Sequence, residues 1–187
     1  LPNGDLYVTE QIPSLTLNDV DSIAHAVAGA SKYELFYDKK EIDFSYGATG
    51  IGRFRVNLYR DQEGTSMAFR VIPETVPTLE ALRLPPILTQ FVMKPRGLVL
   101  VTGPTGSGKS TSLAAMINHA NETRNCHIIT IEDPIEFVYH SKKALITQRE
   151  VNAHTDSFAN AIRSSLRQYP NIILVGEMRD LETIQLA

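Results

Sequence analysis

The segment from residue 103 to residue 110 constrains the fold of this chain more than any other. It reads Gly103-Pro104-Thr105-Gly106-Ser107-Gly108-Lys109-Ser110 and matches G-x-x-x-x-G-K-[ST], the loop that cradles nucleotide phosphates. Residues 98–101 before it are all aliphatic, as in a buried parallel strand, and residues 111–120 after it carry apolar side chains at helical spacing. A strand, a glycine-rich turn and a helix in this order predict an α/β fold with a parallel sheet.

The residue types of this segment fit the chemistry of a triphosphate. Backbone N–H groups at a helix start bind phosphate oxygens, and glycines let the backbone approach them closely. Lys109 is expected to reach the β- and γ-phosphates, and the Ser110 hydroxyl is expected to ligate Mg²⁺. The sequence therefore predicts a site for ATP and Mg²⁺. Its nucleotide-binding residues are Gly103, Pro104, Thr105, Gly106, Ser107, Gly108, Lys109, Ser110 and Thr111.

The composition is that of an ordinary globular protein, with 43% hydrophobic and 21% charged residues among 187. A formal net charge of −3 gives no basic footprint for nucleic acid. The single cysteine, Cys126, excludes a disulfide within the chain. Because the chain starts with Leu1 and stops at Ala187 inside what reads as a helix start, we expect it to be a piece of a longer protein.

The N-terminal part is rich in strand signals. Alternating apolar and polar residues at 51–59 and 65–72 predict two strands joined by a turn, and residues 5–9 are a further candidate. A helix capped by Asn18 or Asp19 is expected to run to about residue 28. These elements predict a small α+β domain over residues 1–77.

A different pattern follows after a stretch broken by prolines. Residues 78–96 are predicted as a linker, and residues 97–187 alternate between apolar strand-like runs and helical patterns. This alternation predicts βαβ units around a parallel sheet. The expected strands are 98–102, 128–131 and 172–175, and the expected helices are 111–122 and 156–168.

Two of these strands run into acidic residues, Glu132 after residues 128–131 and Gly176-Glu177 after residues 172–175. Parallel-sheet proteins bind ligands outside the carboxyl ends of their strands. A hydrolase needs one carboxylate to orient or deprotonate the attacking water and another to hold Mg²⁺, directly or through water. Glu132 and Glu177 are the candidates. The usual magnesium-binding strand ends in Asp, so Gly176-Glu177 is atypical and leaves the role of Glu177 open.

Three arginines of the N-terminal part form a second group of candidates. Arg53 and Arg55 lie in the first alternating run, and Arg70 lies in the second. They are either solvated charges at the edge of a sheet or arginine fingers that reach the ATP of a neighbouring subunit.

Together these motifs resemble the secretion and type IV pilus ATPases, most closely their PilT-like twitching-motility retraction branch. The resemblance covers almost the whole chain. Met178 and the loop at residues 141–143 favour retraction over assembly or secretion. The matching stretches are residues 52–57, 95–97 running into the phosphate loop, 130–136, 148–151 and 175–183.

The resemblance implies a hexameric ATPase with a PAS-like N-terminal domain and a RecA-like P-loop NTPase domain. It implies that Glu132 activates water and that Glu177 binds Mg²⁺ or its waters. It also implies that Arg55 and Arg70, with Arg53 as a secondary candidate, reach the γ-phosphate. The implied partners are the other subunits of the homo-hexamer and a pilus platform protein, which would hold the motor peripherally at the cytoplasmic face of the inner membrane. No nucleic acid is implied.

One departure from the family keeps alternatives open. Tyr169-Pro170-Asn171 replaces a pattern that normally has Asp on both sides of the proline. The alternatives are a pilus assembly or type II secretion ATPase of the same family, an ATP-binding paralogue with little turnover, and a DNA-translocating RecA-like ATPase. The acidic balance of the chain argues against the last.

Overall fold

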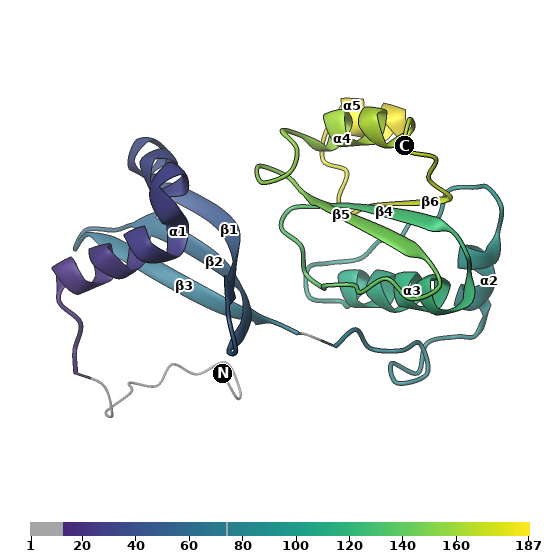
Figure 1. Ribbon diagram of the computed structural model, residues 1–187, viewed down its shortest axis with the longest axis horizontal. Coiled ribbons are helices and arrows are strands. Elements are labelled where there is room, and N and C mark those ends of the chain that lie inside the picture. Colours follow the sequence, from purple (N-terminus) through teal and green to yellow (C-terminus); the bar gives the residue numbers. More distant parts are fainter. Residues whose placement is uncertain (1–12, 74) are drawn as a thin grey trace. The chain divides into compact units, whose positions relative to one another are not determined.

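The computed structural model describes residues 13–73 and 75–187 (Figure 1). The chain divides into two compact units. One runs to Tyr46 and includes Val56–Arg70, and the other holds Gly47–Arg55 and Val71–Ala187. The candidate strand at residues 5–9 lies outside the described residues. The elements are α1 (Leu17–Lys39), β1 (Glu41–Ala48), β2 (Gly52–Arg60), β3 (Thr65–Ile72), α2 (Ile87–Met93), α3 (Lys109–Thr123), β4 (His127–Glu132), β5 (Leu145–Glu150), α4 (Phe158–Ser165), β6 (Ile172–Val175) and α5 (Leu181–Leu186).

The first sheet has the strand order β1-β2-β3. The two alternating runs of the sequence form β2 and β3, as predicted. Along β2, Val56 and Leu58 are fully buried, while Arg53 and Arg55 lie half-buried on the opposite face. Alternation therefore places these two arginines together on one face of the strand.

Helix α1 has its N-cap two or three residues before the predicted one and ends later than predicted. Thr16 is its N-cap, because the Thr16 N–H donates to Asp19 Oδ2 (2.8 Å) and the Asp19 N–H donates to Thr16 Oγ1 (3.2 Å). The prediction of Asn18 or Asp19 as the cap was therefore wrong. The helix breaks at Gly29, where φ is +73°, and then continues to Lys39. Neither α1 nor any other helix within the described ranges has the length and apolar character needed to cross a bilayer.

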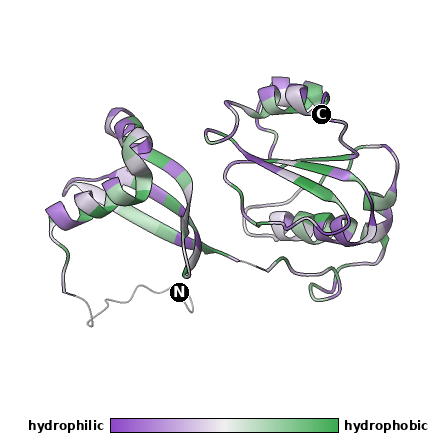
Figure 2. Cartoon of the chain, viewed as in Figure 1, coloured by the Kyte–Doolittle hydropathy of each residue, from purple (hydrophilic) through white to green (hydrophobic). Residues whose placement is uncertain are grey.

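The second sheet is parallel, with the strand order β5-β4-β6. Figure 1 shows α3 on one face of this sheet and α4 with α5 on the other. Ile128 of β4 packs against Ile117 of α3, whereas Ile129 and Ile131 pack against Ile162 of α4. Successive side chains of β4 thus enter two different cores, and Figure 2 shows the hydrophobic colouring that results along this strand. The predicted α/β class with a parallel sheet is confirmed.

Residues 98–102, predicted as a buried strand, form no strand in the structure. Leu98, Val99 and Leu100 leave 64%, 45% and 60% of their surface exposed. A strand exists only through hydrogen bonds to a neighbour. The strands that pair in this sheet are β5, β4 and β6, and β5 and β6 form its two edges within the described residues. The prediction was wrong because an apolar run indicates that a segment can be buried, but it does not provide a neighbouring strand for hydrogen bonding.

Part of the predicted linker packs on the second unit. Leu79 is buried with Ala115 and Met116 of α3, and apolar side chains up to Val92 of α2 join this cluster. The proline-interrupted stretch therefore packs against one side of α3. The predicted domain boundaries after residues 77 and 96 stay predictions.

Asn171 fixes the start of β6 beside β4. Its side-chain Oδ1 accepts the His127 N–H (2.8 Å), and its own N–H donates to His127 O (2.9 Å). These two bonds lie next to the first strand pair, Ile128 with Ile172. An oxygen acceptor at position 171 is what this arrangement requires, and either Asn or Asp supplies one.

Asn171→Ala should lower the free energy of unfolding by about 1 kcal/mol, because the His127 N–H loses its acceptor. Asn171→Asp keeps an oxygen in place and should stay within about 0.5 kcal/mol of the parent. Urea titrations followed by circular dichroism measure both variants. Equal losses in the two would show that this hydrogen bond contributes nothing to stability.

Candidate active site

The phosphate loop is a tight turn that ends where α3 begins. Ser107 N donates to Pro104 O (3.3 Å), and the φ angles of Gly106 and Gly108 are +79° and +88°, in the region that favours glycine. Gly108 precedes the first residue of α3, and no side chain caps the helix there. The first N–H groups of α3 are therefore available to a ligand, and the positive end of the helix favours an anion.

The Ser107 side chain leaves no room for a residue larger than glycine at position 103. A Cβ on Gly103, where φ is +152°, would lie 2.8 Å from Ser107 Oγ. Lys109 Nζ donates to Pro104 O (2.9 Å), so this side chain folds back over the loop. Ser110 and Thr111 follow in the first turn of α3. The loop and the first turn of α3 together contain every predicted nucleotide-binding residue from Gly103 to Thr111.

Glu132 ends β4 on the sheet face that α3 covers. Ile128 packs against α3, and side chains two residues apart on a strand share a face, so Thr130 and Glu132 lie on that side as well. Glu132 is only 8% exposed. The helix that begins at the phosphate loop and the buried carboxylate therefore belong to the same side of the sheet.

The carboxylate of Glu132 is held mainly through one of its two oxygens. Oε1 accepts the Thr130 hydroxyl (2.5 Å) and the Gln148 side-chain amide (3.2 Å), whereas Oε2 accepts only the Glu136 N–H, at 3.4 Å. Burial raises the pKa of Glu132 above its ordinary value, and these three hydrogen bonds oppose the rise. The nearby charge of Glu136 adds to the rise. Oε2 is left as the more available proton acceptor.

Glu132→Gln should stabilise the folded chain near neutral pH. Because folding raises the pKa of Glu132 above 4.5, the folded state binds a proton more tightly than the unfolded state. The stability from this residue is complete below the unfolded pKa and is lost as the pH rises through the folded pKa. The variant removes that loss, and we expect a gain of about 1 kcal/mol, or about 2–4 °C in Tm.

Thermal unfolding of parent and variant, measured from pH 4 to pH 8, tests this expectation. The difference in Tm should vanish at the acidic end and grow as the pH rises. A difference that is the same at every pH would mean that the buried charge does not cause it.

Sequence reasoning missed the two side chains that hold Glu132. The Thr130-x-Glu132 spacing was the available signal for the first, because it puts both residues on one strand face. Gln148 had no local signal. It reaches Glu132 because β5 pairs with β4 in the register that sets Gln148 beside Thr130. Gln148 also donates to Phe137 O (2.9 Å) and accepts the Tyr139 N–H (2.8 Å), which fixes the orientation of its amide.

The end of β6 lies beside the end of β4. Gly176 N donates to Ile131 O (2.8 Å), and a Cβ on Gly176 would lie 3.7 Å from Glu132 Cγ. The structure thus brings Glu132 and residues 176–177 to the same edge of the sheet. The Glu177 carboxylate forms an ion pair with Arg179 (2.9 Å).

The three candidate arginines belong to the β1-β2-β3 sheet. Arg53 and Arg55 are half-buried on β2, and Arg70 is exposed on the neighbouring strand β3. Their predicted role as arginine fingers stays a prediction.

The two side chains predicted to hold Mg²⁺, Ser110 and Glu177, are both oxygen donors. Nowhere in the described part of the chain do three His, Cys, Asp or Glu side chains gather as a metal site. Mg²⁺ keeps several waters and is held by one or two protein groups together with substrate phosphates. An exposed hydroxyl at Ser110 and a carboxylate at Glu177 are donors of that kind.

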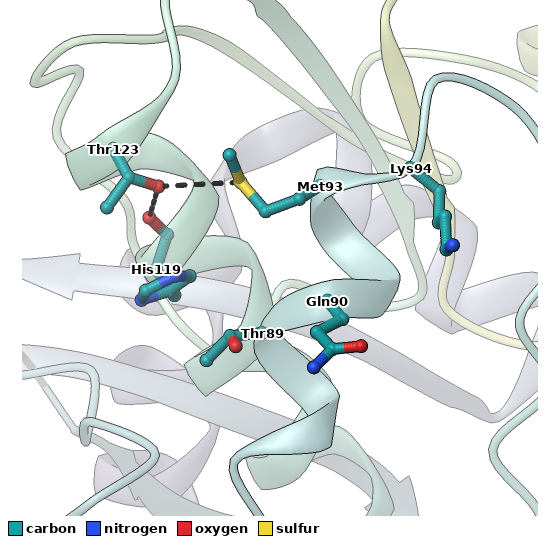
Figure 3. A pocket seen from close by; sticks show the side chains of 6 residues that line it. All are labelled: Thr89, Gln90, Met93, Lys94, His119 and Thr123. Atoms are coloured by element: carbon teal, nitrogen blue, oxygen red, sulfur yellow. Dashed lines mark hydrogen bonds between the residues drawn. The ribbon is translucent and has the colours of Figure 1, made fainter.

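A separate cavity of about 490 Å³ lies between α2 and α3 (Figure 3). Its polar groups are partly engaged with one another. The Thr123 hydroxyl donates to His119 O (2.6 Å) and contacts Met93 Sδ (4.0 Å). None of the predicted site residues lines this cavity, so it is not part of the candidate active site.

Comparison with known proteins shows the family. A sequence model described as type II/IV secretion system protein matches residues 51–187. The chain belongs to this family. Among type II/IV secretion system proteins and their relatives, a "twitching motility protein" of Neisseria gonorrhoeae is 52% identical over 94% of this chain and 47% of its own length. The "type IV pilus retractation ATPase PilT" of Pseudomonas aeruginosa is 48% identical over 98% of this chain and 58% of its own length.

A solved structure of this family has the same fold. The crystal structure of the pilus retraction motor PilT with bound ADP matches with a TM-score of 0.92 and 43% identity, over 98% of this chain and 53% of that one. The resemblance inferred from the motifs is confirmed. The chain spans about half the length of these type II/IV secretion system relatives.

Proposed function

We propose that this chain forms part of an ATP-hydrolysing hexameric motor that drives type IV pilus retraction. Its identity of 48% to a pilus retraction ATPase over nearly the whole chain supports the proposal. The observation that carries it is the position of Glu132, a buried carboxylate on the sheet face covered by α3. Hydrolysis of ATP needs a loop that binds the phosphates and a general base that accepts a proton from water, and both lie on one side of this parallel sheet.

In this proposal the phosphate loop binds ATP through backbone and lysine together. The uncapped first turn of α3 presents its N–H groups to the phosphates, and Lys109 Nζ exchanges its bond with Pro104 O for phosphate oxygens. Ser110 and Glu177 would hold Mg²⁺, which would neutralise charge on the phosphates. For this, Glu177 would give up its ion pair with Arg179.

Glu132 then activates the attacking water. A water oxygen attacks the γ-phosphorus, the bond to the β,γ-bridging oxygen breaks, and the proton of the water passes to Glu132 Oε2. Thr130 and Gln148 hold Oε1, so the carboxylate keeps one orientation while Oε2 faces the reaction. A base whose pKa is raised by burial accepts this proton more readily than an exposed carboxylate does.

The remaining parts of the motor come from other subunits and from the membrane machinery. Arg55 and Arg70, with Arg53 as the secondary candidate, reach the γ-phosphate bound to a neighbouring subunit of the homo-hexamer. A pilus platform protein holds the motor peripherally at the cytoplasmic face of the inner membrane. These assignments follow the family resemblance.

The test of hydrolysis uses the full-length protein with ATP and either Mg²⁺ or excess EDTA. Phosphate release should require Mg²⁺ and should be lost when Lys109 is replaced by alanine. Release that continues in EDTA would overturn the proposed site.

Retraction is tested separately in a piliated strain that lacks its own retraction ATPase. The full-length protein should restore twitching motility, and a Glu132→Gln version should not. If hydrolysis is present but motility is not restored and pili are lost instead, the motor serves assembly or secretion.

A further inference from the structure

The turn that follows β5 is closed by several backbone bonds and is therefore rigid. Asn152 N donates to Thr155 O (2.8 Å), His154 N donates to Glu150 O (2.8 Å), and Val151 forms a β-bridge with Thr155. Asn152 adopts a left-handed conformation with φ of +64°, which Asn tolerates better than most residues. Side chains on this turn are held in place before any ligand arrives.

Two of these side chains present hydrogen-bond donors without using them fully. Arg149 Nη2 donates to His154 O (3.0 Å), while Arg149 Nη1 is buried and has no hydrogen-bond partner among the described residues. His154 Nδ1 accepts the Glu150 N–H (3.0 Å), so the ring proton of a neutral His154 is on Nε2. Arg149 Nη2 carries two N–H groups and uses one of them on His154 O, so the other is left for a ligand.

Both side chains line a cavity of about 440 Å³. Asn152 of the turn and Asn160 and Ser164 of α4 contribute further polar groups to its wall. Asn160 lies in the first turn of α4, where the helix dipole favours negative charge. Asp156 adds a single carboxylate to the wall, and it forms no ion pair with Arg149 within the described chain. The cavity shares no residue with the phosphate loop.

We propose that this cavity is a second oxyanion site, which binds a phosphate or carboxylate group on the second N–H of Arg149 Nη2 and on His154 Nε2. Asp156 accepts a hydrogen bond from a hydroxyl carried by the same ligand, so hydrogen phosphate or a phosphate ester with a free hydroxyl fits better than an anion that has only acceptor oxygens. The site is independent of the proposed ATPase activity.

Titration of the ¹⁵N-labelled chain with inorganic phosphate, at ionic strength kept constant with NaCl, tests the proposal by NMR. The Thr155 amide and the Asn160 side-chain amide should shift in a saturable way with a millimolar Kd. Shifts of the Gly106 and Gly108 amides report the phosphate loop separately. Arg149→Gln should weaken the first set at least tenfold and leave the second unchanged.

Arg163→Gln is the matched control, because Arg163 is exposed and already pairs with Glu182 (2.5 Å), and binding should stay within twofold. If Arg149→Gln does not fold, Asn160→Asp at an exposed position of α4 should weaken binding by a similar factor. Shifts that never saturate, or that are the same in Arg149→Gln or in Asn160→Asp, would overturn the proposal.

The oxyanion has two possible sources, a small phosphate ester in solution or an acidic side chain of a second copy of the chain. Sedimentation equilibrium separates them. Self-association that weakens both with phosphate and in Arg149→Gln assigns the group to a second copy. Self-association that neither one changes, with phosphate binding present, assigns it to a soluble ester.

Discussion

A Glu132→Gln variant of the full-length protein should bind ATP as tightly as the parent and hydrolyse it at least about 10²-fold more slowly. Glutamine has the size of glutamate and keeps an oxygen for the Thr130 hydroxyl and the Gln148 amide. It cannot accept the proton of the attacking water. Binding is retained because the groups that meet the phosphates lie in the loop and in the first turn of α3. Single-turnover hydrolysis together with nucleotide titration measures the two effects separately.

Glu136→Gln is the control for charge alone. Glu136 is exposed in the same segment, and its carboxylate raises the pKa of Glu132 without holding it. This variant should keep turnover within a few-fold of the parent. Near-normal turnover in Glu132→Gln would remove Glu132 from its role as the base. The higher Tm expected of that variant shows independently that the fold is intact.

Arg55→Ala should reduce turnover by about 10³–10⁵, which corresponds to about 4–7 kcal/mol in the transition state. A guanidinium beside the γ-phosphate neutralises charge that develops as the bond breaks. Since the arginine comes from a neighbouring subunit in this proposal, turnover per subunit in the parent should rise with protein concentration. Phosphate release measured over a hundredfold range of concentration shows both effects.

Arg60→Ala on the same strand is the matched control. Arg60 lies over the rings of Tyr37 and Phe36, at 4.4 Å and 5.7 Å from their centres. Its loss should cost about 0.5–1 kcal/mol of stability and leave turnover unchanged. Turnover that is independent of concentration and equal in Arg55→Ala and the parent would exclude a site shared between subunits.

The elements that the sequence predicted well were those whose signal is local. Helix α3 follows a motif that requires a helix there, and β4 and β6 are short aliphatic runs between turn signals. β5 was not predicted, because four of its six residues are polar, as at the edge of a sheet. β1 was not predicted either, although Ile42, Phe44 and Tyr46 alternate along it and could have indicated a strand.

The same difference between local and non-local signals applies to the candidate active site. The phosphate loop is one continuous segment, so its residues could be named from the sequence. The environment of Glu132 depends on the pairing of β4 with β5, which brings Gln148 from sixteen residues away. Register between strands is set by the packing of whole faces, which no local pattern reports. The prediction of a strand at residues 98–102 was wrong for a related reason, because apolar character does not show which strand a segment would pair with.

Gly176 packs closely against the backbone of β4 beside Glu132. The sequence places Gly176 directly after the apolar run of β6, where the usual magnesium-binding strand has Asp. The structure shows the space that an Asp side chain would enter lined by Ile131 O, 3.2 Å from the Cβ position, and by Glu132 Cγ at 3.7 Å. The buried acidic side chain beside this position is Glu132, at the end of the neighbouring strand β4. A residue larger than glycine at 176 should therefore push β6 away from the end of β4 whatever side chain stands at 132, because the nearest atoms, Ile131 O and Glu132 Cα, belong to the backbone.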